Sequence, residues 1–299
     1  MNQSHNQARG ALLASVIIFG TIGVFRRLLP VPSGFLAMAR GLLGASSLLF
    51  FLHIRGGRLS RGAIRSNGVI LLLSGAAIGF NWILLFEAYR YTTVAVATLC
   101  YYMAPIIVLL LSPVLLGERM TPRKLACAAT ACAGMVLVSG VFHAGDAHAS
   151  AMRGILLGLG AAVLYASVIL LNKKLVDLPA YDRSVVQLFV AGIVLIPYVI
   201  VVESGEPLQW SLSGVCLLLL LGVVHTGLAY ALYFASIAAL PAQSVALFSY
   251  LDPAVAILLS AFVLKEHITT PELFGAALIL IAAVVSELPE RSENTHRRQ

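Results

Sequence analysis

Long apolar stretches alternate with short polar segments along almost the whole chain. A helix that crosses a bilayer needs about 20 mostly apolar residues, and ten stretches reach that length. The longest segments between them cover residues 55–68 and 143–153. The pattern therefore predicts an all-α integral membrane protein with ten transmembrane helices, near residues 9–28, 33–54, 69–89, 93–116, 123–142, 154–175, 183–203, 213–236, 242–264 and 271–288.

The composition agrees with a lipid bilayer as the solvent for most of the chain. Hydrophobic residues make up 60% of the 299 positions and charged residues only 11%, whereas soluble domains carry about 25% charged residues. The apolar run after Arg9 is predicted to be a mature spanning helix, because no signal-peptide cleavage pattern follows it.

Positive charge is unevenly shared between the two sets of connecting segments. Most lysines and arginines lie in segments on the same side as the N-terminus, such as the run from Arg55 to Arg65. Because such segments usually stay in the cytoplasm, both termini are predicted to be cytoplasmic. The same bias accounts for the net charge of +7, so no nucleic-acid partner is expected.

The sequence contains no P-loop, HExxH, GxSxG or Rossmann glycine pattern. Its four cysteines lie in apolar runs without zinc-ligand or CxxC spacing and are interpreted as small buried residues. We therefore expect no cofactor, no metal, no enzymatic activity and no ATP-driven transport by this chain alone.

The chain contains an internal repeat at an offset of 148 residues. "YYMAPIIVLLLSPVLLGERMT" lies over "SYLDPAVAILLSAFVLKEHIT" without a gap, and it pairs Pro105 with Pro253 and Ala104 with Asp252. At a nearly equal offset, Arg40 meets Gln187. The predicted units are residues 1–143, residues 154–288 and a polar cytoplasmic tail at 289–299. Because five helices is an odd number, the second unit enters the membrane inverted, an architecture typical of transporters.

Four stretches carry a resemblance to a known family: "FGTIGVFRRLL", "ARGLLG", "FEAYRYTTVAVATLCYYMAPIIVLLLSPVLLGE" and "SYLDPAVAILLSAFVLKE". Together with the repeat, they resemble the EamA-type branch of the drug/metabolite transporter superfamily over essentially the whole chain. The resemblance implies a secondary transporter or facilitator of the bacterial inner membrane. It would export a small organic solute such as an amino acid, a related metabolite or an amphiphilic drug.

The resemblance also implies a midplane cavity lined by the third, fourth, eighth and ninth helices, with the first and sixth beside it. The fifth and tenth helices would lie at the periphery. Their small residues, in "CAATACAG" and "FGAALILIAA", are expected to allow close helix contact within the chain, and a dimer face is the alternative.

Three acidic or basic residues lie well inside the predicted spans, away from their ends, and are candidates for function. Asp252 is interpreted either as a proton site or cation anchor, or as a capped acid at a helix break. His225 could relay protons or bind a carboxylate, or it could be a neutral hydrogen-bonding group in the packing. For Arg40 a structural role is favoured over attraction of an anionic solute. Glu87 and Arg90, three residues apart, are predicted to pair.

Aromatic residues away from the helix ends complete the predicted cavity. Such walls suit a small amphiphilic or aromatic solute, or a cation, and plain packing is the alternative for each ring. The predicted substrate-binding residues are Asn81, Trp82, Tyr101, Tyr102, Tyr165, His225, Tyr230, Phe248, Tyr250 and Asp252.

A proline follows a tyrosine by three residues in each half, at Tyr102 and Pro105 and again at Tyr250 and Pro253. Proline is tolerated in membrane helices where neighbours satisfy the freed carbonyl, and it provides a place to bend. Pro105 and Pro253 are therefore predicted to be hinges, with static kinks as the alternative.

Two other classes of function were weighed against transport. An integral membrane enzyme or lipid-handling protein would need acid, base or metal-binding residues that converge on one site. Asp252 and His225 alone are weak support for such a site. A structural or sensor protein would not explain the repeat. The residues leave open the solute, the direction and coupling ion of transport, including proton coupling, and the oligomeric state.

Overall fold

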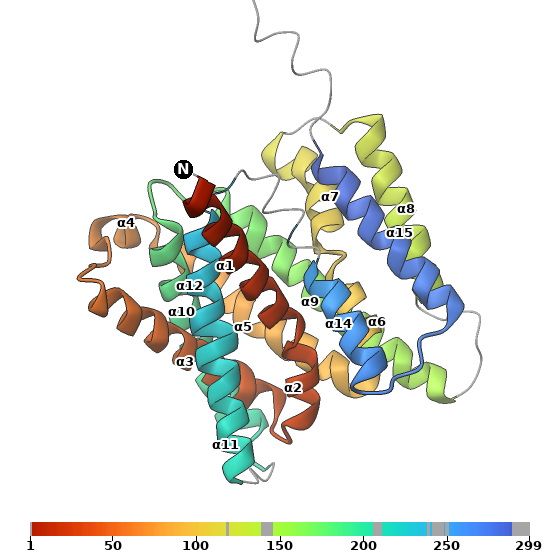
Figure 1. Cartoon of the computed structure of the whole chain (residues 1–299), viewed down its shortest axis with the longest axis horizontal. Coiled ribbons are helices and arrows are strands. Elements are labelled where there is room, and N and C mark those ends of the chain that lie inside the picture. Colours follow the sequence, from red (N-terminus) through yellow and green to blue (C-terminus); the bar gives the residue numbers. More distant parts are fainter. Residues whose placement is uncertain are drawn as a thin grey trace, which may run out of the picture.

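The computed structural model describes residues 2–117, 120–138, 146–205, 211–237, 240, 248 and 251–288. All regular structure in these ranges is helical, so the predicted all-α fold is confirmed there (Figure 1). The helices are α1 (Asn2–Gly20), α2 (Ile22–Leu28), α3 (Ser33–Ile54), α4 (Arg61–Ser66), α5 (Gly68–Tyr91), α6 (Val94–Tyr101), α7 (Ala104–Leu116), α8 (Pro122–Val138), α9 (Asp146–Asn172), α10 (Ala180–Val202), α11 (Leu212–Leu219), η1 (Leu220–Leu228), α12 (Ala229–Ile237), α14 (Leu251–Phe262) and α15 (Thr270–Glu287).

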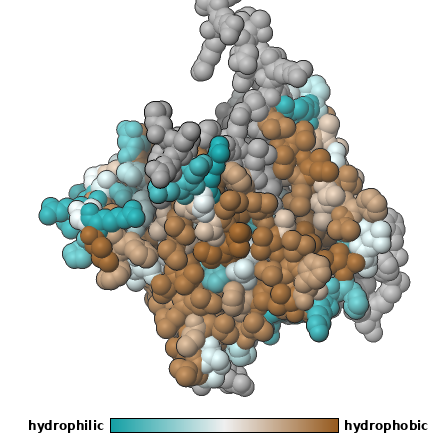
Figure 2. All heavy atoms as spheres, viewed as in Figure 1, coloured by the Kyte–Doolittle hydropathy of each residue, from teal (hydrophilic) through white to brown (hydrophobic). Residues whose placement is uncertain are grey.

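Within the described ranges, seven helical segments are long and apolar enough to cross a membrane. Two shorter apolar helices, Leu251–Phe262 and Thr270–Val285, follow them. Large apolar side chains such as Phe50, Val114 and Leu212 are exposed, and hydrophobic residues cover most of the visible face in Figure 2. A surface of this kind fits lipid rather than water. The seven segments are Asn6–Leu28, Ser33–Ile54, Gly68–Tyr91, Val94–Leu115, Ala149–Asn172, Ala180–Val202 and Leu212–Tyr233.

Three of these segments are not regular α-helices along their length. Thr21 separates α1 from α2, and Tyr102 and Met103 separate α6 from α7. Pro105 lies in the first turn of α7, where it cannot donate to the Tyr101 carbonyl because proline has no N–H. The third irregularity is η1, a π-helix between α11 and α12; π segments are rare and occur frequently at functional sites.

The helices of the N-terminal half pack mainly against helices of the C-terminal half. The main contacts join α5 to α9, α3 to α10, α8 to α15, and α1 to α12 and α14. In Figure 1, α8 and α15 lie side by side at one edge of the molecule. The functional side chains are therefore positioned between segments that are far apart in the sequence.

Close contact between α8 and α15 depends on two glycines. A Cβ atom on Gly134 would lie 2.7 Å from the Gly275 carbonyl oxygen, and one on Gly275 would lie 2.5 Å from the Gly134 carbonyl oxygen. These distances are too short for any larger residue without movement of the backbones. The prediction that small residues serve packing within the chain is confirmed for this helix pair.

Candidate functional site

Arg40 on α3 lies in the interior between the two halves. Its side chain is only 3% exposed. Its Nε donates to the Thr226 hydroxyl at 2.8 Å, and its guanidinium lies 4.5 Å from the centre of the Trp82 ring and 5.7 Å from that of Phe86. Such cation–π contacts stabilise a desolvated guanidinium. Arg40, for which the sequence favoured a structural role, thus lies beside Trp82, a predicted cavity residue.

Asp252 lies in the first turn of α14 and faces the break between α6 and α7. Its Oδ2 accepts a hydrogen bond from the Tyr102 hydroxyl at 2.5 Å. Asp252 and Arg40 lie within electrostatic range of each other, but they form no direct ion pair within 4.0 Å. The interior therefore holds two opposite charges that are near each other without touching.

His225 connects the break in helix α1–α2 to the π-helix. Its Nδ1 lies 3.1 Å from the Leu220 carbonyl oxygen and its Nε2 lies 2.7 Å from the Thr21 hydroxyl. Because a carbonyl can only accept, Nδ1 carries the proton, and in the neutral ring Nε2 is an acceptor. The single proton of the Thr21 hydroxyl is shared between Nε2 and the Ile18 carbonyl oxygen, which lies 2.7 Å from the hydroxyl. Phe25 packs edge-on against the ring at 5.0 Å. Both ring nitrogens are thus committed to bonds within the protein.

The predicted aromatic residues form two groups. Tyr101 lies 5.2 Å from Tyr165 and 6.1 Å from Tyr102, measured between ring centres. Tyr230 packs edge-on against Phe19 at 5.3 Å. Tyr165 is 38% exposed, so protein covers only part of its ring.

The other predicted residues have different surroundings. Asn81 is 1% exposed and donates to the Ala161 carbonyl oxygen at 2.5 Å, which is a packing contact between α5 and α9. Phe248 packs against a small cluster that includes Leu12 and Val16. Tyr250 lies outside the described residues. Pro253 lies in the first turn of α14, as Pro105 does in α7.

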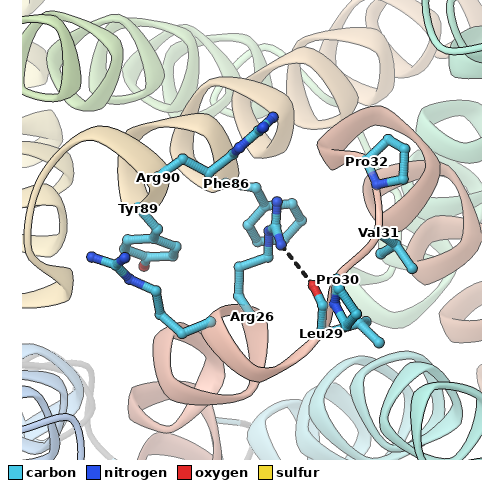
Figure 3. A pocket seen from close by; sticks show the side chains of 9 residues that line it. Arg26, Leu29, Pro30, Val31, Pro32, Phe86, Tyr89 and Arg90 are labelled. Carbon is cyan, nitrogen blue, oxygen red and sulfur yellow. Dashed lines mark hydrogen bonds between the residues drawn. The ribbon is translucent and has the colours of Figure 1, made fainter. Parts of the chain in front are cut away.

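A cavity of about 480 Å³ opens at the end of α5 and α2 (Figure 3). Arg26 is buried there; its two Nη atoms donate to the Leu29 carbonyl and the Ser33 hydroxyl, and its Nε has no partner among the described residues. Arg27 pairs with Glu266 at 3.0 Å. This arginine pocket is lined by Arg26, Arg27, Leu29, Pro30, Val31, Pro32, Phe86, Tyr89 and Arg90.

Phe86 lies between the arginine pocket and Arg40. Phe86 and Tyr89 line the pocket, and Phe86 also contacts the Arg40 guanidinium. Arg90 pairs with Glu87 at 3.1 Å, which confirms the pair that the three-residue spacing predicts.

Among the described residues, no three His, Cys, Asp or Glu side chains lie close enough together to hold a metal ion.

Sequence reasoning named Arg40 as a candidate but favoured a structural role for it, and it missed Thr226. Arg40 is an arginine within an apolar span, and such residues usually face the bundle interior. Thr226 carried no comparable signal, because a threonine in a membrane helix can satisfy its hydroxyl on its own backbone.

These features define a helical integral membrane protein with a polar, aromatic interior between two halves. Residues 9–140 and 152–287 each match the EamA-like transporter family, so the chain belongs to that family, as the resemblance implied. It is therefore a membrane transporter.

Relatives from two organisms agree with the family. The uncharacterized transporter YxxF of Bacillus subtilis is 30% identical over 249 residues, which cover 83% of this chain and 79% of that protein. An uncharacterized transporter of Archaeoglobus fulgidus is 26% identical over 280 residues, 92% of this chain and 94% of that one. A solved crystal structure shares the fold with a TM-score of 0.66 at 18% identity, over 97% of this chain and 99% of the other.

Proposed function

We propose that this protein is a secondary transporter or facilitator that exports a small organic solute by alternating access at a site between its two halves. The observation that carries the proposal is that charged side chains in the interior join the two halves, Arg40 by its bond to Thr226 and Asp252 by its bond to Tyr102. A site near the midplane between repeats is the arrangement that inverted-repeat transporters use.

The pattern of helix contacts supports an inverted repeat of five helices in each half. The repeat offset relates α5 to the α11–η1–α12 segment, α9 to α1 and α2, and α6–α7 to α14. The contact of α5 with α9 then has its counterpart in α12 with α1, and that of α7 with α9 in α14 with α1. The pairs α3–α10 and α8–α15 are their own counterparts. These relations favour ten spans, divided at residues 143 and 154.

The distribution of positive charge supports an orientation with both termini in the cytoplasm of a bacterial cell. In that orientation the arginine pocket lies at the outer end of α5. The break at Tyr102 and the first turn of α14, which contains Pro253, lie beside the interior charges, and this placement supports hinge motion at the two prolines.

Transport by purified protein in liposomes tests the proposal. A panel of labelled amino acids, amines, organic acids and drugs is loaded, and efflux is compared with that from protein-free liposomes at two pH values. Trp82→Ala, Tyr102→Ala and Tyr250→Ala should each slow efflux, whereas Phe50→Ala, a matched change on the exposed surface, should not. Normal transport by all three interior variants would contradict the proposed site.

The alternative function is that of an enzyme acting on lipid, and the same purified protein can be assayed for lipid conversion. Protein that converts an added lipid but moves no solute would overturn the transport proposal.

A further inference from the structure

Arg40 forms no ion pair with a carboxylate of the described residues. The structure gives its side chain one hydrogen bond, from Nε to Thr226, and neither Nη atom has an acceptor among the described residues. The rings of Trp82 and Phe86 contact the guanidinium but supply no lone pair. A buried charge is stable only when it is paired or hydrogen-bonded, so the two Nη atoms are suited to an incoming acceptor.

Asp252 shows the complementary feature. Only one of its oxygens receives a hydrogen bond from the described residues, that of Tyr102, and no Lys or Arg of those residues lies within ion-pair distance. The carboxylate therefore retains acceptor capacity toward the interior.

The two charges lie near each other in the interior, and aromatic side chains lie near both. Tyr101 and Tyr230 each lie within electrostatic range of both Arg40 and Asp252, and both tyrosines are only partly buried. In a low-dielectric interior, opposite charges attract strongly. Their failure to form a direct pair indicates that their side chains are held apart by their other contacts, with Thr226 for Arg40 and with Tyr102 for Asp252.

The internal repeat shows that neither charge is needed to build the fold. The counterpart of Arg40 is the uncharged Gln187, whose amide nitrogen donates to the Ser74 hydroxyl at 2.6 Å and to Asn172 at 2.7 Å. The counterpart of Asp252 is Ala104. The amide nitrogen of Gln187 thus has two acceptors within the protein, whereas neither Nη atom of Arg40 has one among the described residues.

The arginine pocket lies close to Arg40, with the Phe86 ring between them. Three arginines line the pocket, and Arg26 forms no ion pair among the described residues. The pocket therefore favours a negatively charged group on the far side of the Phe86 ring from Arg40.

We propose that the transported solute is a zwitterion whose carboxylate binds the Nη atoms of Arg40 and whose ammonium group binds Asp252. The inference rests on the transport function proposed above and names the charge pattern of its solute. A guanidinium presents parallel donors that match a carboxylate. The ring faces of Tyr101 and Tyr230 can accommodate the ammonium group and the apolar part of the solute.

A charge series in wild-type protein tests the proposal without any mutation. Alanine, leucine and phenylalanine are each compared with the amide, which lacks the carboxylate, and with the corresponding carboxylic acid without the amino group. Efflux from proteoliposomes is corrected for protein-free liposomes. For at least one skeleton we expect the zwitterion to be transported roughly tenfold or more faster than either singly charged compound, because a buried charge left unpaired is strongly unfavourable.

Two variants assign the ends of the solute. Arg40→Gln should remove the preference for the amino acid over its amide, and Arg40→Lys should keep part of it. Asp252→Asn should remove the preference for the amino acid over the acid without the amino group. Arg153→Gln is the matched control, because Arg153 also stacks on a ring, that of Tyr91 at 5.1 Å, but is exposed.

The outcomes separate this inference from the proposed function. If the protein moves other members of the wider panel but prefers no zwitterion in any skeleton, the inference is wrong and the transport function stands. An equal loss for the amino acid and its amide in Arg40→Gln overturns the carboxylate contact. If no solute of the panel moves, the transport proposal fails and the inference fails with it.

Discussion

The Tyr102 hydroxyl donates to the Asp252 carboxylate at 2.5 Å and so ties the break between α6 and α7 to the first turn of α14. The bond joins the two halves of the chain where their proline-containing helices begin. Hydrogen bonds to charged acceptors are stronger than neutral ones, so this contact should contribute measurably to stability.

Removal of the Tyr102 hydroxyl is expected to destabilise the protein. Tyr102→Phe should cost about 1.5–3 kcal/mol, because a charged group loses its hydrogen bond. Thermal unfolding in detergent measures the effect. Tyr165→Phe is the control, since its hydroxyl has no hydrogen bond among the described residues, and it should change stability by less than about 0.5 kcal/mol. Equal midpoints for the two variants would contradict a stabilising role of the bond.

Replacement of Asp252 by asparagine should uncouple transport from an imposed pH difference. Asparagine cannot gain or lose a proton in this range, so flux that depends on protonation of Asp252 would lose its response to the gradient. Efflux is measured with the liposome interior more alkaline than, equal to and more acidic than the outside. Asp182→Asn, a buried acid bonded to the Ser60 backbone N–H, is the control. An unchanged response in Asp252→Asn would remove this residue from a proton-carrying role.

Glu266 should matter more for stability than the arginine with which it pairs. Its carboxylate accepts from Arg27, from the Val94 backbone N–H at 2.9 Å and from the Ser260 hydroxyl. Arg27→Ala removes an exposed ion pair worth about 0–1 kcal/mol. Glu266→Ala also leaves the first turn of α6 without an acceptor and should cost roughly 1–3 kcal/mol. Unfolding of both single variants and the double variant measures the difference, and equal losses would argue against the capping role.

Larger residues at the contact between α8 and α15 should destabilise the helix pair. Gly134→Leu and Gly275→Leu would each force a side chain against a backbone carbonyl, and overpacking costs about 1–3 kcal/mol or more. Gly10→Leu is the matched control, because no atom lies within 4 Å of a Cβ placed there. Lower thermal midpoints are expected for the first two variants only; a similar drop in Gly10→Leu would point to a general effect of leucine.

Substitution of the two prolines should show whether they are needed for the motion of transport or only shape the starts of their helices. Pro105 and Pro253 lie in first turns of helices, where the absence of an N–H is tolerated, so Pro105→Ala and Pro253→Ala should fold with little loss of stability. If the prolines act as hinges, both variants should transport more slowly while binding solute as before. Normal transport rates in folded variants would leave the prolines as static features of the helix starts.

The sequence predicts most helices of this fold because the bilayer sets their length. The apolar runs locate α3, α5, α10 and the C-terminal end of α9 within three residues, since few other structures satisfy the backbone in lipid. Local spacing also suffices for the Glu87–Arg90 pair and for the small residues of α8 and α15. In each of these cases the relevant neighbours are close in sequence or share one simple packing rule.

The π-helix and the surroundings of Arg40 could not be derived in the same way. A π-helix differs from an α-helix by one residue in its hydrogen-bond step, and hydropathy does not register that difference. The contact of Arg40 with Trp82 depends on which face of α3 meets α5 and η1. Hydrophobic periodicity gives no answer for a helix that is apolar on all sides.

The difference between Arg40 and Gln187 has a consequence for how such a protein can arise. Two separate copies of one five-helix subunit, assembled as an antiparallel pair, would carry every substitution twice, so an arginine in one would appear in both. Fusion of the copies into a single gene, visible here as two family matches in one chain, frees each half to mutate alone. Each half can then carry a charge that the other lacks, as Arg40 and Asp252 do in this chain.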